Sequence, residues 1–291
     1  MQKKYNLVYF GSPDFSASIL SNLLTVNDVR VVGVVTQPDS PKGRKQIMSP
    51  SAVAQVAQQA DLPVFKPEKL DDANLAHLKI LKPDLFLVVA YGKIIPDTWL
   101  VTPSIKTLNI HFSLLPKYRG ALCVSEAIKN GDQQTGVTLM EMTSKLDQGP
   151  VIAAITLPIE PQDNVATLTE KLIAPANQLL KYELPLYLDG AVKASAQDEA
   201  FATLTPSYKS RNRTNAFIPF STLEQAMLGK NASSIHNLIR SLNPDPGAWT
   251  TLNGKDLKII STQVVENKLQ LLTVQYPGKN IIPWSSLDSN H

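Results

Sequence analysis

Three polar residues, Asn109, His111 and Asp147, are of the types that catalyse acyl transfer to an amine. Asn109 and His111 alternate with Leu108 and Ile110, so on a β-strand both polar side chains point to the same face. Their N–H groups can stabilise the oxyanion of a tetrahedral intermediate. Asp147, in a loop between two predicted strands, can orient the histidine, and either group can accept the amine's proton. An Asn-x-His pair at a strand end also has purely structural uses, so the spacing alone leaves both interpretations open.

Other catalytic signatures are missing from the sequence. Gly11-Ser-Pro-Asp-Phe-Ser16 follows the first predicted strand but lacks the G-x-G-x-x-G spacing that dinucleotide binding requires. The chain has neither G-x-x-x-x-G-K-[ST] nor G-x-S-x-G, so phosphate-loop and serine-hydrolase chemistry lack their motifs. Its single cysteine, Cys123, excludes an intramolecular disulfide, and four histidines without close pairing predict no metal site.

The elements that must position these residues alternate between apolar strands and amphipathic helices. Strands are predicted over 5–10, 31–36, 62–66, 85–90, 107–111, 137–142 and 151–159, and helices over 15–25, 51–59, 71–80, 120–130 and 167–188. This alternation predicts an α/β fold with an open, mostly parallel, Rossmann-like sheet covered on both faces. Pro116 ends the 107–111 strand because it has no N–H to donate. The basic segment 117–120 that follows is where open α/β sheets place their chemistry.

The remaining segments differ in character. Residues 37–48 are polar and basic, with two prolines and a glycine, and are predicted as a long functional or disordered loop. Residues 191–208 show no period and are predicted to link a catalytic domain, 1–190, to a second domain, 209–291. In that domain, a helix over 233–241 and short strands over 249–252, 257–262, 268–274 and 281–284 predict a small β-barrel.

The charge distribution separates the two regions. Residues 205–291 hold nine Lys/Arg and five Asp/Glu, a net +4, whereas residues 1–204 hold 19 and 20, a net −1. The basic C-terminal third fits a polyanionic partner, and a solvated surface explains it as well. The N-terminal apolar run of about six residues is too short for a signal peptide, and no run approaches a membrane span. We therefore expect a cytoplasmic protein.

Three motifs carry a family resemblance: Asn109-Ile-His111, Ser113-Leu-Leu-Pro-Lys-Tyr-Arg-Gly-Ala121 and Leu146-Asp-Gln-Gly149. Together they resemble the formyltransferase family that uses 10-formyltetrahydrofolate. Supporting matches extend along the chain, at Gly11-Ser-Pro-Asp-Phe15, Thr36-Gln-Pro-Asp39, Pro41-Lys-Gly-Arg44, Pro63-Val-Phe-Lys-Pro67 and Val89-Ala-Tyr-Gly92. The segment 238–250 is similar to the C-terminal tRNA-binding barrel of those members that act on initiator Met-tRNA.

The resemblance implies formyl transfer from 10-formyltetrahydrofolate to the α-amino group of methionine on initiator Met-tRNA, for translation initiation. It implies Asn109, His111 and Asp147 as a catalytic trio, an OB-like C-terminal barrel, a monomer and no metal. The implied folate-binding residues are Val88, Val89, Ala90, Tyr91, Ser113, Leu114, Leu115, Pro116, Gly120 and Asp147. The implied tRNA-binding residues are Lys42, Arg44, Lys45, Lys209, Arg211, Arg213 and Lys258.

Some positions depart from the family pattern. Tyr118 stands where the family usually has Trp, Leu122-Cys-Val124 replaces Ala-Pro-Ile, Gly43-Arg-Lys-Gln46 replaces Gly-Arg-Gly-Lys, and Asp245 replaces an aromatic residue. These changes affect expected acceptor contacts and leave the trio intact. Two alternatives remain: formyl transfer to another amine, such as an amino sugar nucleotide or glycinamide ribonucleotide, and a non-catalytic tRNA-binding homologue. The basic C-terminal domain argues against the first alternative, and the complete trio argues against the second.

Overall fold

The computed structural model describes residues 4–43 and 46–287. The chain divides into two compact units. Unit 1 consists of Met1–Arg119, Gly136–Thr156 and Leu172–Ala202, and unit 2 of Gly120–Thr135, Leu157–Lys171 and Thr203–His291. Both units are therefore assembled from segments that are distant in the sequence.

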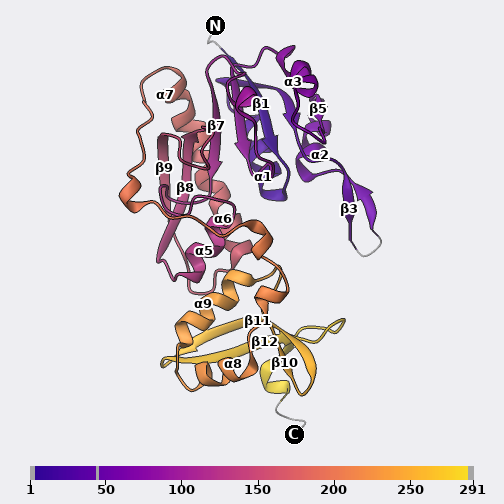
Figure 1. The fold of residues 1–291 in the computed structure, drawn as a ribbon, viewed down its shortest axis with the longest axis vertical. Helices are drawn as coiled ribbons and strands as arrows, with labels where there is room; N and C mark the ends of the chain where they lie inside the picture. The colour runs from indigo at the N-terminus through magenta and orange to yellow at the C-terminus, as the bar shows by residue number, and fades with distance from the viewer. Residues whose placement is uncertain (1–3, 44–45, 288–291) are drawn as a thin grey trace. The chain divides into compact units, whose positions relative to one another are not determined.

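Unit 1 is built around a seven-stranded sheet of order β5-β2-β1-β6-β7-β8-β9 (Figure 1). The strands are β1 (Tyr5–Gly11), β2 (Val29–Val35), β5 (Val64–Phe65), β6 (Leu85–Val89), β7 (Lys106–His111), β8 (Gln134–Glu141) and β9 (Val151–Pro158). From β5 to β7 every pairing is parallel, and β8 pairs antiparallel with β7. The predicted α/β fold with a mostly parallel, Rossmann-like sheet is confirmed.

Helices cover both faces of this sheet, as the buried apolar strands require. The helices before β7 are α1 (Asp14–Leu23), α2 (Ala52–Gln59), α3 (Asp72–Lys79) and α4 (Asp97–Leu100). Val8 and Phe10 of β1 pack with residues of α3 and α4 in one core cluster. Tyr9, on the opposite face, donates a hydrogen bond from its hydroxyl to the Ser16 carbonyl of α1 at 2.7 Å. The predicted helix over 167–188 is observed as α6 (Val165–Gln178), a π-helical turn (Leu179–Glu183) and α7 (Leu184–Leu188).

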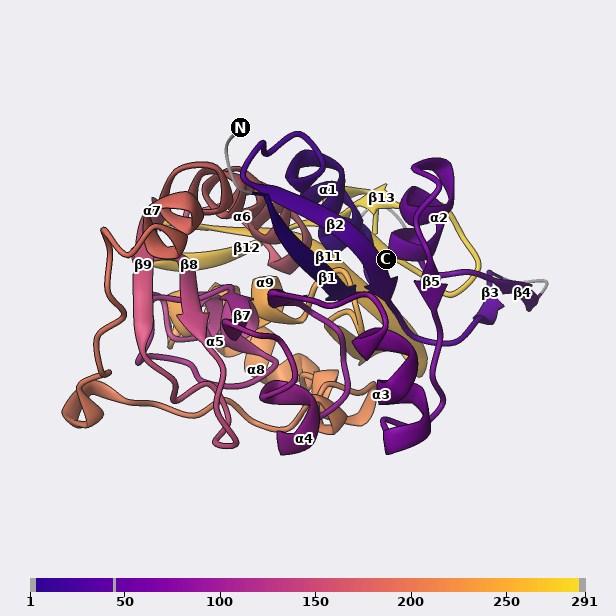
Figure 2. The same ribbon diagram turned by 90° about the horizontal axis from the view of Figure 1, so that it is seen from above.

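The segment after β2 corrects one prediction. Of the two alternatives for residues 37–48, a functional or a disordered loop, the structure corrects the second: it has a β-hairpin of β3 (Ser40–Lys42) and β4 (Ile47–Ser49). It projects away from the sheet in both views (Figures 1 and 2). Its polar composition hid the pairing because an exposed two-stranded hairpin has no buried face to produce an apolar alternation.

Unit 2 packs helices against a four-stranded antiparallel sheet of order β10-β11-β12-β13. These strands are β10 (Trp249–Leu252), β11 (Lys255–Val265), β12 (Lys268–Gln275) and β13 (Ile282–Pro283). Helices α8 (Phe220–Met227) and α9 (Ala232–Leu242) pack on the sheet, and α5 (Cys123–Lys129) packs on α9. Leu223 of α8, Ile239 of α9 and Ile259 of β11 share the core. The small C-terminal β domain is confirmed, whereas α8 was not predicted. In the described part of the chain, no helix is long and apolar enough to cross a membrane.

Candidate active site

Strand β7 presents Asn109 and His111 near its carboxyl end. Both residues are buried, with 8% and 6% of their surface exposed. Within residues 4–43 and 46–287, no group forms a side-chain hydrogen bond with the Asn109 carboxamide. Its amide atoms are not among the fully buried polar atoms that lack a partner, so they keep some accessibility and can hydrogen-bond a ligand.

A main-chain carbonyl fixes the orientation of the His111 ring. Nε2 of His111 lies 3.0 Å from the carbonyl oxygen of Tyr118. A carbonyl oxygen can only accept, so Nε2 carries the proton in this hydrogen bond. Nδ1 is therefore the ring nitrogen that this hydrogen bond leaves as an acceptor.

Asp147 faces that nitrogen. Its Oδ2 atom lies 3.7 Å from His111 Nδ1, and both side chains are largely shielded, at 12% and 7% exposure. The separation is an ion-pair distance, longer than a hydrogen bond; catalytic contacts often tighten only when substrate is bound. Without a proton between them, the Nδ1 lone pair and the carboxylate would repel. The pair is thus suited to hold one proton and to exchange it with a substrate.

The loop that carries Asp147 lies between β8 and β9 and has an unusual backbone. Asp147 adopts φ +49°, in the left-handed region, which Asp enters more readily than most residues with a Cβ. Gly149, two residues later, lies so close to β8 that a Cβ on it would be 1.8 Å from the Glu141 carbonyl oxygen. Only glycine fits there, and its close approach holds the loop against the strand.

A buried threonine that the sequence analysis missed fastens the loop after β7. Thr138, opposite His111 on β8, donates from its hydroxyl to the Ser113 carbonyl at 2.6 Å and accepts from the Leu115 N–H at 3.2 Å. The Ser113 hydroxyl donates to the Lys117 carbonyl at 2.7 Å. The only sequence signal for Thr138 was a polar residue inside the apolar run of β8.

The expected folate-binding segment at the end of β6 is mainly core. Val88, Val89 and Tyr91 are buried, whereas Ala90 is exposed at φ +53°. The Tyr91 ring packs edge-on against Phe10, 5.6 Å between centroids. Burial raises the pKa of Tyr91 to about 12, and its hydroxyl has no hydrogen-bond partner among the described residues. Of residues 88–91, Ala90 is the exposed one.

The other expected folate-binding residues lie in the loop after β7. Ser113 is buried, Leu114 to Pro116 are partly buried, and Gly120 adopts φ +115°. Arg119 in the same loop is not a free cation, because only 2% of its side chain is exposed and its guanidinium pairs with Glu199 at 2.8 Å. Hydrogen bonding with Glu199 raises the pKa of Arg119 and lowers that of the Glu199 carboxyl.

The expected tRNA-binding cations differ in their exposure and in their hydrogen-bond or ion-pair partners. Arg44 and Lys45 lie outside the described residues, and of Lys42 only the backbone, in β3, is described. In unit 2, Lys209 is exposed, and Lys258 donates to the Pro244 carbonyl at 2.9 Å. Arg213 pairs with Asp256 and stacks on Trp249, its Cζ 4.1 Å from the ring centroid.

Arg211 forms hydrogen bonds within unit 2. Its guanidinium donates to the Ser125 hydroxyl at 3.0 Å, to the Ser241 carbonyl at 2.9 Å and to the Asp245 carbonyl. Cys123, at the start of α5, is a buried core residue. Among these side chains, Lys209 and Arg213 remain the most accessible to a phosphate backbone.

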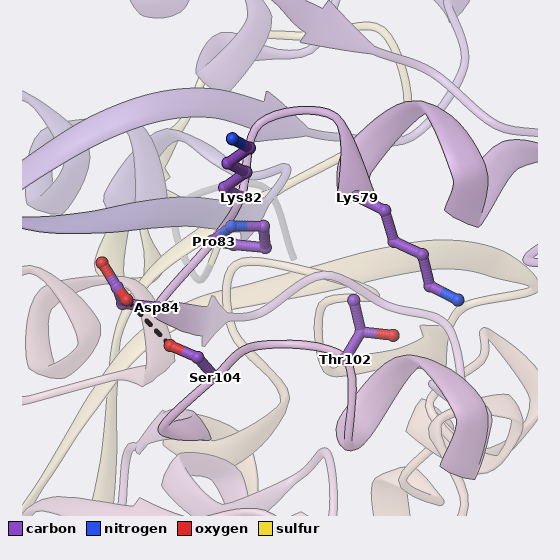
Figure 3. A pocket seen from close by; sticks show the side chains of 6 residues that line it. All are labelled: Lys79, Lys82, Pro83, Asp84, Thr102 and Ser104. Atoms are coloured by element: carbon purple, nitrogen blue, oxygen red, sulfur yellow. Dashed lines mark hydrogen bonds between the residues drawn. The ribbon is translucent and has the colours of Figure 1, made fainter.

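A small cavity of about 280 Å³ lies elsewhere in unit 1 (Figure 3). Its walls come from Lys79, Lys82, Pro83, Asp84, Thr102 and Ser104. Asp84 accepts a hydrogen bond from the Ser104 hydroxyl at 2.7 Å, drawn as the dashed line in Figure 3. Asp84 and Ser104 precede β6 and β7, so this cavity is at the amino ends of the strands and is separate from the His111–Asp147 pair.

Comparisons with known proteins agree with this architecture. Residues 4–183 match the formyl transferase family, and residues 228–283 match the formyl transferase C-terminal domain. The methionyl-tRNA formyltransferase of Staphylococcus epidermidis is 39% identical over 263 residues, covering 90% of this chain and 81% of that protein. The methionyl-tRNA formyltransferase of Staphylococcus aureus strain Newman is 38% identical over 265 residues, with the same coverage.

Solved structures share the fold at low sequence identity. An N-formyltransferase from Helicobacter canadensis, in complex with folinic acid and dTDP-3-aminofucose, superposes with a TM-score of 0.65 at 20% identity, covering 91% of this chain and 88% of that one. A phosphoribosylglycinamide formyltransferase from Anaplasma phagocytophilum gives a TM-score of 0.55 at 21% identity, covering 70% of this chain and 100% of that one. With the family matches over both ends of the sequence, the chain belongs to the formyl transferase family.

Proposed function

We propose that this chain transfers the formyl group of 10-formyltetrahydrofolate to the α-amino group of methionine on initiator Met-tRNA. Family membership and the methionyl-tRNA formyltransferase relatives at 38–39% identity support the reaction. One observation supports the assignment of residues: Asp147 Oδ2 lies 3.7 Å from His111 Nδ1. His111 is on β7, the strand that also carries Asn109.

The trio has two tasks in this proposal, one for Asn109 and one shared by His111 and Asp147. Asn109 donates an N–H to the formyl oxygen, which becomes negatively charged as the amine nitrogen attacks the formyl carbon. The His111–Asp147 pair accepts the proton that the amine loses. When the bond from the formyl carbon to N10 breaks, a proton returns to N10 and the formylated amine is left. The folate co-substrate supplies the activated formyl group, and the protein supplies orientation, the hydrogen bond and the proton site.

Two features support a folate site here. Asn109 is 8% exposed and its carboxamide has no side-chain hydrogen-bond partner among the described residues, and the exposed residue Ala90 directly follows β6, the strand beside β7. Polar main-chain groups at strand ends are a common way to bind a planar heterocycle. We place the folate along 88–91 and 113–116, and the tRNA along the exposed cations of unit 2 and the β3–β4 hairpin.

The direct test is an acceptor comparison. Purified protein is given 10-formyltetrahydrofolate and, in parallel, methionine-charged initiator tRNA, methionine-charged elongator tRNA, free methionine or an amino sugar nucleotide. We expect formylation of the initiator species alone. Transfer only to a small amine would keep the formyltransferase chemistry and remove the tRNA assignment. No transfer, with tRNA still bound, would support a non-catalytic homologue.

Substitution of the trio tests the residue roles. Asn109→Ala, His111→Ala and Asp147→Asn should each lower kcat by about 10²–10⁴-fold, because each removes a group that acts on the reacting atoms. His77→Ala, at an exposed position in α3, is the matched control and should keep wild-type turnover. Wild-type kcat in any of the three variants removes that residue from the mechanism.

A further inference from the structure

The segment 195–199, predicted as linker, runs alongside the Asp147 loop. Ser195 and Val151 exchange two main-chain hydrogen bonds of 2.8 Å and form an antiparallel bridge. Two residues further along in that register, Gln197 comes opposite Gly149. Its Nε2 atom donates to the Gly149 carbonyl at 2.7 Å and to the Asp147 carbonyl at 2.8 Å. One carboxamide therefore binds the backbone on both sides of Gln148.

Arg119 fixes the orientation of that carboxamide. Its Nε and Nη2 atoms donate to Gln197 Oε1 at 3.1 and 2.9 Å. A guanidinium has only donors, so the oxygen of Gln197 must face Arg119 and its NH₂ group must face the loop. The other edge of Arg119 is held by Glu199, with hydrogen bonds of 2.9 and 2.8 Å. Both ends of the Gln197 side chain are thus satisfied, and the amide has one stable orientation.

The same arginine borders both partners of the catalytic pair. The residue before it, Tyr118, accepts the hydrogen bond from His111 Nε2 at 3.0 Å. Through Gln197, Arg119 also holds the carbonyl of Asp147, a residue whose backbone lies in the left-handed region. Hydrogen bonding with Glu199 and the nearby negative charges of Glu199 and Asp147 keep Arg119 charged by raising its pKa.

We propose that Gln197 and Arg119 are positioning residues for formyl transfer, which together set the Asp147 carboxylate opposite His111 Nδ1. This rests on the proposed role of Asp147 in accepting the amine's proton. Displacing a catalytic group by 1 Å can slow the reaction about 10²-fold. A less firmly held Asp147 loop is therefore expected to lower kcat. Gln197 touches main-chain groups of the loop and is placed here through Asp147, with no direct contact to the reacting atoms.

Two substitutions at Gln197 separate its contacts. Gln197→Met keeps the length of the side chain and removes both the donated and the accepted hydrogen bonds. Gln197→Glu keeps the acceptor for Arg119 and replaces the NH₂ donor with an oxygen that repels the two carbonyls. Gln178→Glu, at an exposed position in α6, makes the same charge change away from the loop and serves as the control. All are assayed as full-length protein with Met-tRNA, and each is checked by its thermal unfolding midpoint.

We expect both Gln197 variants to lower kcat by at least about tenfold, with KM for folate and Met-tRNA within about twofold of wild type. The Gln178 control should match wild type. Wild-type kcat in both Gln197 variants, while Asp147→Asn is inactive, overturns the positioning role and leaves the proposed function standing. A parallel loss of kcat and folate or tRNA affinity, with a lowered unfolding midpoint, also overturns it, because that pattern marks a purely structural clamp. An active Asp147→Asn variant removes the proposed mechanism itself, and the positioning role with it.

Discussion

The close approach of Gly149 to strand β8 makes Gly149→Ala the most informative single perturbation of the Asp147 loop. A Cβ at this position would lie 1.8 Å from the Glu141 carbonyl oxygen, 2.9 Å from the Glu141 carbonyl carbon and 3.3 Å from Met140 Cε. The first two atoms belong to the backbone of the sheet, so they cannot rotate away. The substitution must therefore move the loop, and it does so without changing any side chain of the proposed trio.

The size of that movement follows from the clash. Cβ–O separations below 3.0 Å essentially never occur, so the 1.8 Å separation must open by about 1.2 Å. Asp147 is two residues away, and its carbonyl and that of Gly149 are held by the same Gln197 amide. A shift of about 1 Å at a catalytic group costs roughly 10²-fold in rate, or about 2.7 kcal/mol of transition-state stabilisation.

The assay is steady-state formylation of methionine-charged tRNA, with kcat and KM determined separately for each substrate. Gly33→Ala, in β2, is the matched control, because its Cβ would meet only side-chain atoms closely, Leu81 Cδ1 at 2.8 Å and Phe65 Cε2 at 3.2 Å, whereas the nearest backbone atom, the Pro63 carbonyl oxygen, lies at 3.7 Å. We expect a fall of about 10² in kcat for Gly149→Ala and near wild-type turnover for Gly33→Ala. If Gly149→Ala keeps wild-type kcat while remaining folded, the link between loop position and turnover is refuted.

Two further predictions concern buried polar groups. Thr138→Val leaves the Ser113 carbonyl and the Leu115 N–H without their hydroxyl partner, so denaturant unfolding should show a loss of about 1–3 kcal/mol; unchanged stability would mean that the loop finds other partners. His236, buried between the Thr262 hydroxyl at 2.7 Å and the Pro161 carbonyl at 3.0 Å, has its pKa lowered from 6.5 by burial. The unfolded chain then binds more protons just below pH 6.5, so the free energy of unfolding should fall as pH drops through that range. Denaturant titrations should show that the free energy of unfolding changes less between pH 5 and pH 7 in His236→Gln than in wild type. An equal change in both proteins would contradict the link between the His236 pKa and stability.

The strand and helix positions of unit 1 were predictable because they depend on local pattern. The apolar runs that became β1, β2 and β6 are buried on both faces, and such strands are visible as unbroken apolar segments. Ser51 and Asp71 cap the starts of α2 and α3 by accepting hydrogen bonds from the N–H groups of Ala54 and Asn74. Within the candidate site, the shared face of Asn109 and His111 followed from the period of two along β7.

The rest of the site depends on contacts between distant residues, to which local periodicity is insensitive. Gln197 binds carbonyls about 50 residues earlier in the chain, and its partner Arg119 is 78 residues away. The polar, aperiodic composition of 191–208 predicted a linker because such a segment offers no apolar face. The basic segment 117–120 likewise predicted a cationic loop, whereas Arg119 is buried and neutralised by Glu199.

The boundary between the two units assigns residues 191–202, predicted as part of a linker, to unit 1. Residues up to Ala202 belong to unit 1, and Thr203 begins the C-terminal part of unit 2. The stretch 195–199 is therefore part of the unit that holds His111 and Asp147, fixed there by the Ser195–Val151 bridge and the Arg119 hydrogen bonds. A chain cut before Ser195 would keep Asn109, His111 and Asp147 and would lose the Gln197 hydrogen bonds to the Asp147 and Gly149 carbonyls. Unit 1 accordingly extends through Ala202, although the apolar pattern of its last helix ends near Leu188.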